Sequence, residues 1–203
     1  MKITRSVAIL VALAGLCCMS VAAQDTAAAK PAAEPAGMAM PMPKATPEMT
    51  KLIRTMSGNW TVSEKYEPSP MTPKGGSGTG TAKIWQGPGG LSLMETYHSS
   101  GTMGPNFNGV GTWWYDAKAQ VFHGLWCDNT TPNGCDAGGT TKWEGDKFVG
   151  TMESEMGGQK MTTRFIYSDF KPDSFVMTME MGPDVSKLQK SMTITYTKSP
   201  NKM

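Results

Sequence analysis

The sequence predicts an all-β domain, an antiparallel up-and-down β-barrel of about eight to ten strands behind a short N-terminal helix. Apolar and polar residues alternate with a period of two over most of the chain after residue 59, as half-buried strands require. The turn-rich segments between these stretches are too short for the crossovers of parallel strands. About ten strands in so short a chain must form a sandwich or a barrel, and a closed barrel has no aggregation-prone edges.

The N-terminal residues have the layout of an export signal. Lys2 and Arg5 form a positive head, an apolar run of about ten residues follows, and small residues end at Ala23. This order predicts a secretory signal peptide over residues 1–23. The apolar run is shorter than the roughly 20 residues of a transmembrane helix, so we expect no membrane span after cleavage.

Cysteines in this segment leave a second interpretation open. A lipoprotein would be lipidated at Cys17 or Cys18, but neither follows the small residue that such a signal requires. Cleavage after Ala23 predicts a periplasmic or secreted protein. The signal carries two of the 19 basic residues and none of the 17 acidic residues, which leaves 17 of each. Since no net charge remains, we expect no nucleic-acid partner.

Residues 24–46 are rich in alanine, proline and methionine. Few large apolar side chains and many prolines predict a disordered linker. Thioethers are soft ligands that suit Cu(I), which would make this segment a metal site. Because methionine is common throughout the chain, with 18 residues in all, a flexible tether is the simpler interpretation.

The β-domain is expected over residues 47–199, and a helix begins it. Thr46 is a capping residue and Pro47 occupies the first helical position. Apolar residues then recur at helical spacing at Met49, Leu52 and Met56. The strands are expected at residues 60–67, 81–85, 91–98, 110–115, 120–127, 140–143, 148–155, 160–170, 174–181 and 191–198. The sequence predicts a loop at residues 68–80 and a helical turn at residues 186–189.

The mature chain keeps two cysteines, Cys127 and Cys135, separated by seven turn-rich residues. In an oxidising compartment such a pair predicts a disulfide. Closing so short a ring stabilises the fold by roughly 2–3 kcal/mol. A zinc site is a poor alternative because no second cysteine pair or histidine cluster accompanies them. We expect no metal and no cofactor.

Strand alternation indicates which side chains face the interior. Phe175, Met177 and Met179 share one face of their strand, and Ile194 and Tyr196 share one face of theirs. These faces predict either an apolar ligand pocket or a core filled by side chains. The residues expected to face a ligand are Trp60, Glu95, Tyr97, His123, Trp126, Met177, Met179 and Tyr196.

Glu95 is the most informative of these residues. It is in phase with Leu91, Leu93 and Tyr97, which predicts an inward carboxyl group. Burying a lone carboxylate is costly, so Glu95 should be paired or have a raised pKa. Arg164 is a candidate partner. The alternative is an outward, solvated Glu95.

Other polar residues have structural interpretations. His123 lies on the opposite face of its strand from Phe122 and Trp126, and the sequence leaves open which face is inside. Asp116 and Asp128 begin turns, where an aspartate commonly accepts hydrogen bonds from the following backbone.

Two motifs resemble known families. Gly58-Asn59-Trp60 after Leu52 is similar to the entry of lipocalin-like proteins. The run Asn-Gly-Val-Gly-Thr-Trp-Trp-Tyr-Asp at 108–116, followed by Phe122 and by Leu-Trp-Cys-Asp at 125–128, resembles the bacterial domain-of-unknown-function family 1579. The resemblance covers about residues 48–198. It implies a calycin-like barrel and no particular activity.

Two positions depart from the family pattern. Trp114 stands where members usually have glycine, and Cys127 stands where serine or another residue is usual, which fits a local disulfide. A related barrel family binds haem through a histidine near its C-terminus. No histidine follows His123 here, so the resemblance does not carry haem binding over.

Three functions remain open. The chain has no glycine-x-serine-x-glycine elbow, phosphate loop or dinucleotide fingerprint. We therefore predict non-catalytic binding of a small apolar ligand inside the barrel. One alternative is an enzyme on a small organic substrate that uses Glu95 with Tyr97 or His123. The other is an envelope module whose exposed aromatic side chains contact a protein.

Overall fold

The computed structural model describes residues 41–69, 72–102, 104–156 and 158–200. The predicted signal peptide and most of the predicted linker lie outside these residues, and 41–46 have no regular structure. Among the described residues, no helix has the length and apolar character needed to cross a bilayer.

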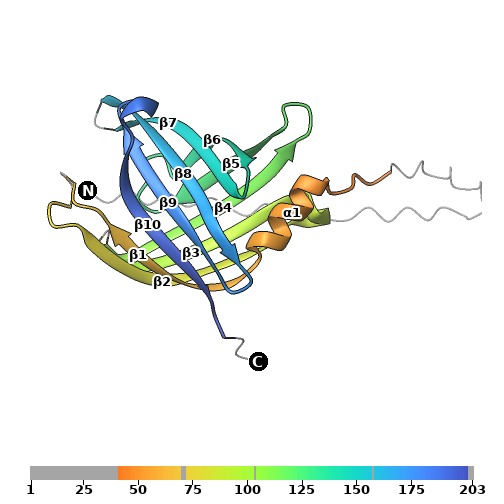
Figure 1. Ribbon diagram of the computed structural model, residues 1–203, viewed down its shortest axis with the longest axis horizontal. Coiled ribbons are helices and arrows are strands. Elements are labelled where there is room, and N and C mark those ends of the chain that lie inside the picture. Colours follow the sequence, from red (N-terminus) through yellow and green to blue (C-terminus); the bar gives the residue numbers. More distant parts are fainter. Residues whose placement is uncertain (1–40, 70–71, 103, 157, 201–203) are drawn as a thin grey trace, which may run out of the picture. The chain divides into compact units, whose positions relative to one another are not determined.

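The described residues form ten antiparallel strands in one closed barrel (Figure 1). The strands are β1 Gly58–Tyr66, β2 Gly76–Gln86, β3 Ser92–Gly101, β4 Gly104–Asp116, β5 Val121–Asp128, β6 Cys135–Glu144, β7 Lys147–Met156, β8 Gln159–Lys171, β9 Ser174–Gly182 and β10 Gln189–Lys198. Each strand pairs with its neighbours in the chain, and β1 pairs with β10 to close the barrel. The predicted up-and-down barrel is confirmed.

The helix α1, Pro47–Met56, lies at one end of this barrel (Figure 1). Thr46 Oγ1 accepts a hydrogen bond from Met49 N at 3.2 Å, which caps the helix as predicted. Met49, Leu52 and Met56 are buried. We call this the helix end of the barrel, where β1 begins and β10 ends. The opposite end, where β1 ends and β2 begins, is the loop end (Figure 1).

Large side chains fill the interior at the helix end. Trp60, Phe122, Phe148 and Phe175 are at most 2% exposed. Trp60 meets Phe175 edge-on with ring centroids 4.9 Å apart, and its indole Nε1 donates to the Met56 carbonyl at 3.0 Å. The helix therefore closes this end over a packed aromatic core.

Three strands, β2, β4 and β6, begin about five residues earlier than predicted, and glycines explain the first of them. Residues 76–80, predicted as loop, are the first part of β2. A Cβ at Gly78 would collide with the Glu64 carboxyl group, and one at Gly80 with the β3 backbone at His98. The strand needs glycine because its neighbours approach closely. Residues 135–139 were likewise left outside the predicted strand, although β6 begins at Cys135.

The 3₁₀ turns Pro88–Gly90 and Val185–Lys187 complete the described structure. Leu91 follows the first of them with helical backbone angles (φ −86°, ψ −8°) and is 37% exposed. The expectation that Leu91 shares the inward face of Leu93 and Glu95 is therefore wrong. The strand alternation begins only at Ser92.

The predicted disulfide joins Cys127 and Cys135, which lie opposite each other on β5 and β6 with Cα atoms 3.9 Å apart. Asp128 organises the enclosed loop, since its Oδ1 accepts hydrogen bonds from Thr130 N and Thr131 N, both at 2.7 Å. The prediction for Asp128 is confirmed.

Replacing both cysteines with serine is expected to lower the free energy of unfolding by roughly 2–3 kcal/mol, because the unfolded chain regains the freedom of an open loop. Urea unfolding of the oxidised wild type and the variant measures the difference. Reduced wild type is the matched control and should unfold near the variant's midpoint. Equal midpoints for oxidised and reduced protein would contradict the prediction.

Candidate functional site

Many inward-facing aromatic and methionine side chains are partly exposed toward the loop end, in contrast to the buried core of Trp60, Phe122, Phe148 and Phe175 at the helix end. At the helix end Trp113, Tyr115 and Trp143 are also partly exposed. Toward the loop end the partly exposed inward residues of these types are Tyr66, Phe107, Trp126, Met152, Met161, Phe165, Met179, Met181 and Met192. Barrel diameter grows with strand number, and ten strands enclose more room than the eight that side chains just fill. Solvent therefore reaches an inner wall of aromatic and methionine side chains from the loop end.

A buried carboxyl group lies in this interior on β1. Glu64 is 4% exposed. Tyr97 Oη on β3 donates to its Oε1 at 2.5 Å, and Tyr66 Oη donates to its Oε2 at 2.7 Å. Burial and the hydrogen bond to Glu64 raise the pKa of Tyr97 and Tyr66 well above their usual range. Both phenols therefore remain hydrogen-bond donors at neutral pH.

The second buried carboxyl group is Glu95 on β3, which is 3% exposed as its inward prediction requires. Tyr196 Oη on β10 donates to Glu95 Oε1 at 3.4 Å. Burial raises the pKa of Glu95 to about 8, against which the hydrogen bond from Tyr196 acts. The candidate partner Arg164 is not near it. Arg164 faces outward because it is out of phase with the inward residues of β8. Its Nη2 lies 3.8 Å from Glu144 Oε2.

Aromatic rings surround these carboxyl groups. The ring of Tyr97 lies edge-on to those of Phe107, Trp126 and Tyr196, at centroid distances of 6.0, 6.3 and 6.4 Å. Tyr196 in turn stacks on Phe175 at 4.2 Å. The polar cluster thus lies between the packed helix end and the more open loop end.

His123 is not part of this cluster. Phe122 is 1% exposed, so its face of β5 is the inner one. His123 lies outside, with Nε2 3.6 Å from Asp116 Oδ2 and its ring stacked on Trp114 at 5.7 Å. Asp116 Oδ1 also accepts from Lys118 N at 2.8 Å, as predicted for a turn aspartate. The structure therefore does not bring His123 together with Glu95.

The other predicted ligand-facing residues all point inward, but at different depths. Glu95, Tyr97, Trp126, Met179 and Tyr196 lie around or beside the cluster. Met177 is 5% exposed in register with Ile194, and Trp60 belongs to the core at the helix end.

The sequence interpretation missed Glu64. Its signal was present, because Glu64 is in phase with the inward residues Trp60 and Val62 on the same strand. Only the register places it beside Gly78, where the missing side chain leaves room for its carboxyl group.

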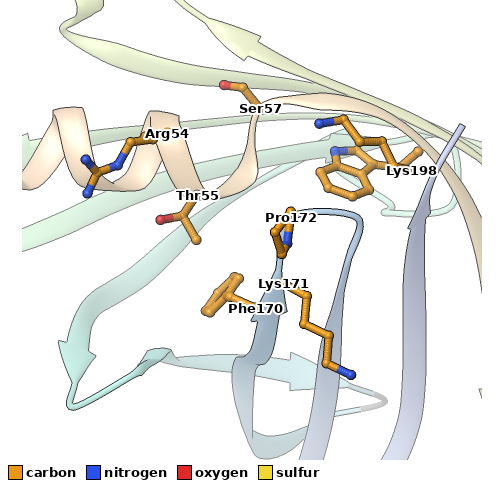
Figure 2. Close-up of a pocket in the computed structure, with 8 residues that line it drawn as sticks. Arg54, Thr55, Ser57, Phe170, Lys171, Pro172 and Lys198 are labelled. Carbon is orange, nitrogen blue, oxygen red and sulfur yellow. The ribbon is translucent and has the colours of Figure 1, made fainter. Parts of the chain in front are cut away.

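A cleft of about 270 Å³ lies elsewhere, at the helix end (Figure 2). Arg54, Lys171 and Lys198 line it, but their charged ends lie apart and do not converge (Figure 2). Convergent polar groups are what a ligand site requires, so this cleft is a weaker candidate than the barrel interior. In the described part of the chain, no three His, Cys, Asp or Glu residues gather as metal ligands do.

On the outer face, the side chains of Val110, Trp114 and Leu125 are 50%, 42% and 36% exposed. They lie on the neighbouring strands β4 and β5, where Trp114 pairs with His123.

Comparison with known proteins decides the family. The model of the family described as "Protein of unknown function (DUF1579)" matches residues 46–198. The chain belongs to this family. The comparison with curated proteins finds no match.

Two solved structures share the fold of this DUF1579 domain at low sequence identity. Rv2717c from M. tuberculosis is 12% identical with a TM-score of 0.52, over 77% of this chain and 100% of that one. The S-type phycobiliprotein lyase CPES from Guillardia theta is 9% identical with a TM-score of 0.51, over 76% of this chain and 94% of that one. At such identities the likeness extends to the fold alone.

Proposed function

We propose that this protein is an exported, non-catalytic binding protein that takes a small, largely apolar molecule into the barrel through the loop end. The observation that carries the proposal is the contrast in the interior. The helix end holds a buried core of Trp60, Phe122, Phe148 and Phe175, whereas most aromatic and methionine side chains that face inward toward the loop end remain partly exposed. Methionine-rich walls adapt to varied apolar shapes, and a few buried polar groups orient the ligand.

Catalysis is less well supported. General acid–base chemistry needs a second titratable group within reach of Glu95 whose pKa suits neutral pH. Tyr97 donates to Glu64 instead, and the pKa of Tyr97 and of Tyr196 is raised by burial. His123 lies on the outer face of β5.

Filling the loop end of the interior should block binding. Nile red, a neutral apolar dye, is titrated against the purified chain and its fluorescence measured. Met179→Trp is expected to weaken dye binding about tenfold, or by about 1.4 kcal/mol, because Met179 faces inward beside Met192.

The matched control is Thr178→Trp, which places the same side chain on the outer face of β9. It should bind the dye as the wild type does. An equal loss of affinity for Nile red in both variants, or no dye binding by the wild type, would contradict the proposed function.

A further inference from the structure

The buried interior holds acids without bases. Glu64 and Glu95 are 4% and 3% exposed, and no lysine, arginine or histidine is among the buried residues of the described chain. The strand lysines and Arg164 lie on outer positions or at strand ends, where Lys65, Lys142 and Lys160 pair with surface acids. Buried carboxyl groups are normally matched by cations, so this interior lacks a positive partner.

Glu95 has fewer hydrogen-bond donors than Glu64. The carboxyl group of Glu64 accepts hydrogen bonds from two tyrosine hydroxyls, whereas that of Glu95 accepts one, from Tyr196 Oη to Oε1 at 3.4 Å. Among the described residues, none donates to Glu95 Oε2. That oxygen is therefore an unused partner for a polar group of a ligand.

Tyr167 on β8 gives a second, independent observation at the same place. It is 9% exposed, faces inward opposite Phe148, and its ring lies 6.5 Å from that of Phe175, which stacks on Tyr196, the donor to Glu95. No hydrogen bond joins its hydroxyl to another described residue. A buried tyrosine normally finds such a partner, so its oxygen is a second unpartnered polar group in the same interior.

The walls around this position are aromatic. The rings of Phe107, Trp126 and Tyr196 lie at steep angles to that of Tyr97. Rings arranged around an acid attract a cation both through their faces and through the acid's charge, and such attraction is strongest where water is excluded.

We propose that the ligand of this interior is an organic amine, an apolar body ending in an ammonium group that donates to Glu95 and Tyr167. This inference rests on the proposed function. A carboxylate or phosphate ligand would find no cation among the buried residues of the described chain. A wholly neutral ligand would leave Glu95 and Tyr167 without partners.

Binding an ammonium ion is expected to depend on pH. In the free protein, burial raises the pKa of Glu95 to about 8, so the group is protonated at pH 6 to 7. An ammonium ion prefers the ionised form, so binding releases a proton and affinity rises with pH up to about 8. The tyrosines near Glu95 are Tyr97 on β3 itself, Tyr167 on β8 and Tyr196 on β10, whose raised pKa values keep them neutral over this range.

Three matched eight-carbon compounds test the inference by calorimetric titration of the purified chain at pH 7.5: octylammonium, 1-octanol and octanoate. Octylammonium is expected to bind about tenfold more tightly than either of the others. Its affinity should rise about tenfold between pH 6.5 and 8, while that of 1-octanol stays constant.

Glu95→Gln should remove both the preference for octylammonium and its pH dependence while leaving 1-octanol binding unchanged. Tyr167→Phe should weaken octylammonium binding about threefold, as the loss of one hydrogen bond implies. Glu153→Gln, at an exposed acid on the outer face of β7, is the control and should leave all three affinities unchanged.

Equal affinities for octylammonium and 1-octanol, or tighter binding of octanoate, would overturn the amine inference and leave the proposed function standing. An unchanged preference for octylammonium in Glu95→Gln would also overturn it. If none of the three compounds and no Nile red binds, the proposed function itself fails.

Discussion

Glu95→Gln is expected to stabilise the folded protein at pH 7 by about 3 kcal/mol. Burial raises the pKa of Glu95 from its ordinary 4.5 to about 8. Between pH 4.5 and pH 8 the unfolded chain is stabilised because Glu95 ionises in it, whereas the folded chain keeps Glu95 protonated. Glutamine removes this difference and keeps an acceptor for the hydroxyl of Tyr196.

The sign of the effect fixes its pH profile. Below about pH 4.5 Glu95 is protonated in both the folded and the unfolded chain, so it does not lower the free energy of unfolding. As the pH rises toward about 8, the free energy of unfolding of the wild type is expected to fall by up to about 1.4 kcal/mol per unit, and then to level off. Urea unfolding at a series of pH values measures this slope.

The control for this prediction is Glu153→Gln, because Glu153 pairs with Lys160 at an exposed position. It should shift stability by no more than about 0.5 kcal/mol at any pH. Parallel curves for wild type and Glu95→Gln between pH 5 and 8 would show that Glu95 is not a buried, protonated carboxyl group.

Trp60→Ala is expected to destabilise the barrel by about 3–5 kcal/mol. Trp60 is 2% exposed, packs edge-on against Phe175 and donates to the carbonyl of Met56, so it joins β1, the core and the end of α1. Its removal leaves a cavity that α1 cannot refill without losing its own contacts.

A second tryptophan provides the matched control. Trp114 is 42% exposed on the outer face of β4, so Trp114→Ala should cost far less, about 1 kcal/mol or below. Thermal unfolding of the wild type and both variants measures their order of stability. Comparable losses for the two variants would mean that the helix end is not closed by a packed core.

Much of the fold is predictable because the physical signals are local. The period-two alternation of β9, with Phe175, Met177 and Met179 facing in, identifies both the strand and its inner face. Tight turns between consecutive strands imply antiparallel order, which leads to a closed barrel. The cap of α1 at Thr46 and the disulfide spacing are local in the same sense.

The errors occur where partners distant in sequence decide the structure. Gly76–Gly80 has the composition of a loop, but it is a strand because Glu64 and the backbone of β3 approach it closely. The hydrogen-bond partner of Glu95 and the charge partner of Arg164 depend on register, which no local pattern specifies. Alternation places Glu64, Glu95 and Tyr167 on inward faces, but only register shows which tyrosine meets which acid.

The most direct test of the account uses the methionines as reporters of ligand contact. Methyl-labelled protein is titrated with octylammonium and the methionine methyl resonances are followed by NMR. We predict shifts at the inward methionines Met152, Met161, Met179 and Met192, with none at Met49 on the buried face of α1 or at outward Met94. Shifts confined to Met94, or an unchanged spectrum at saturating ligand, would contradict a ligand site inside the barrel.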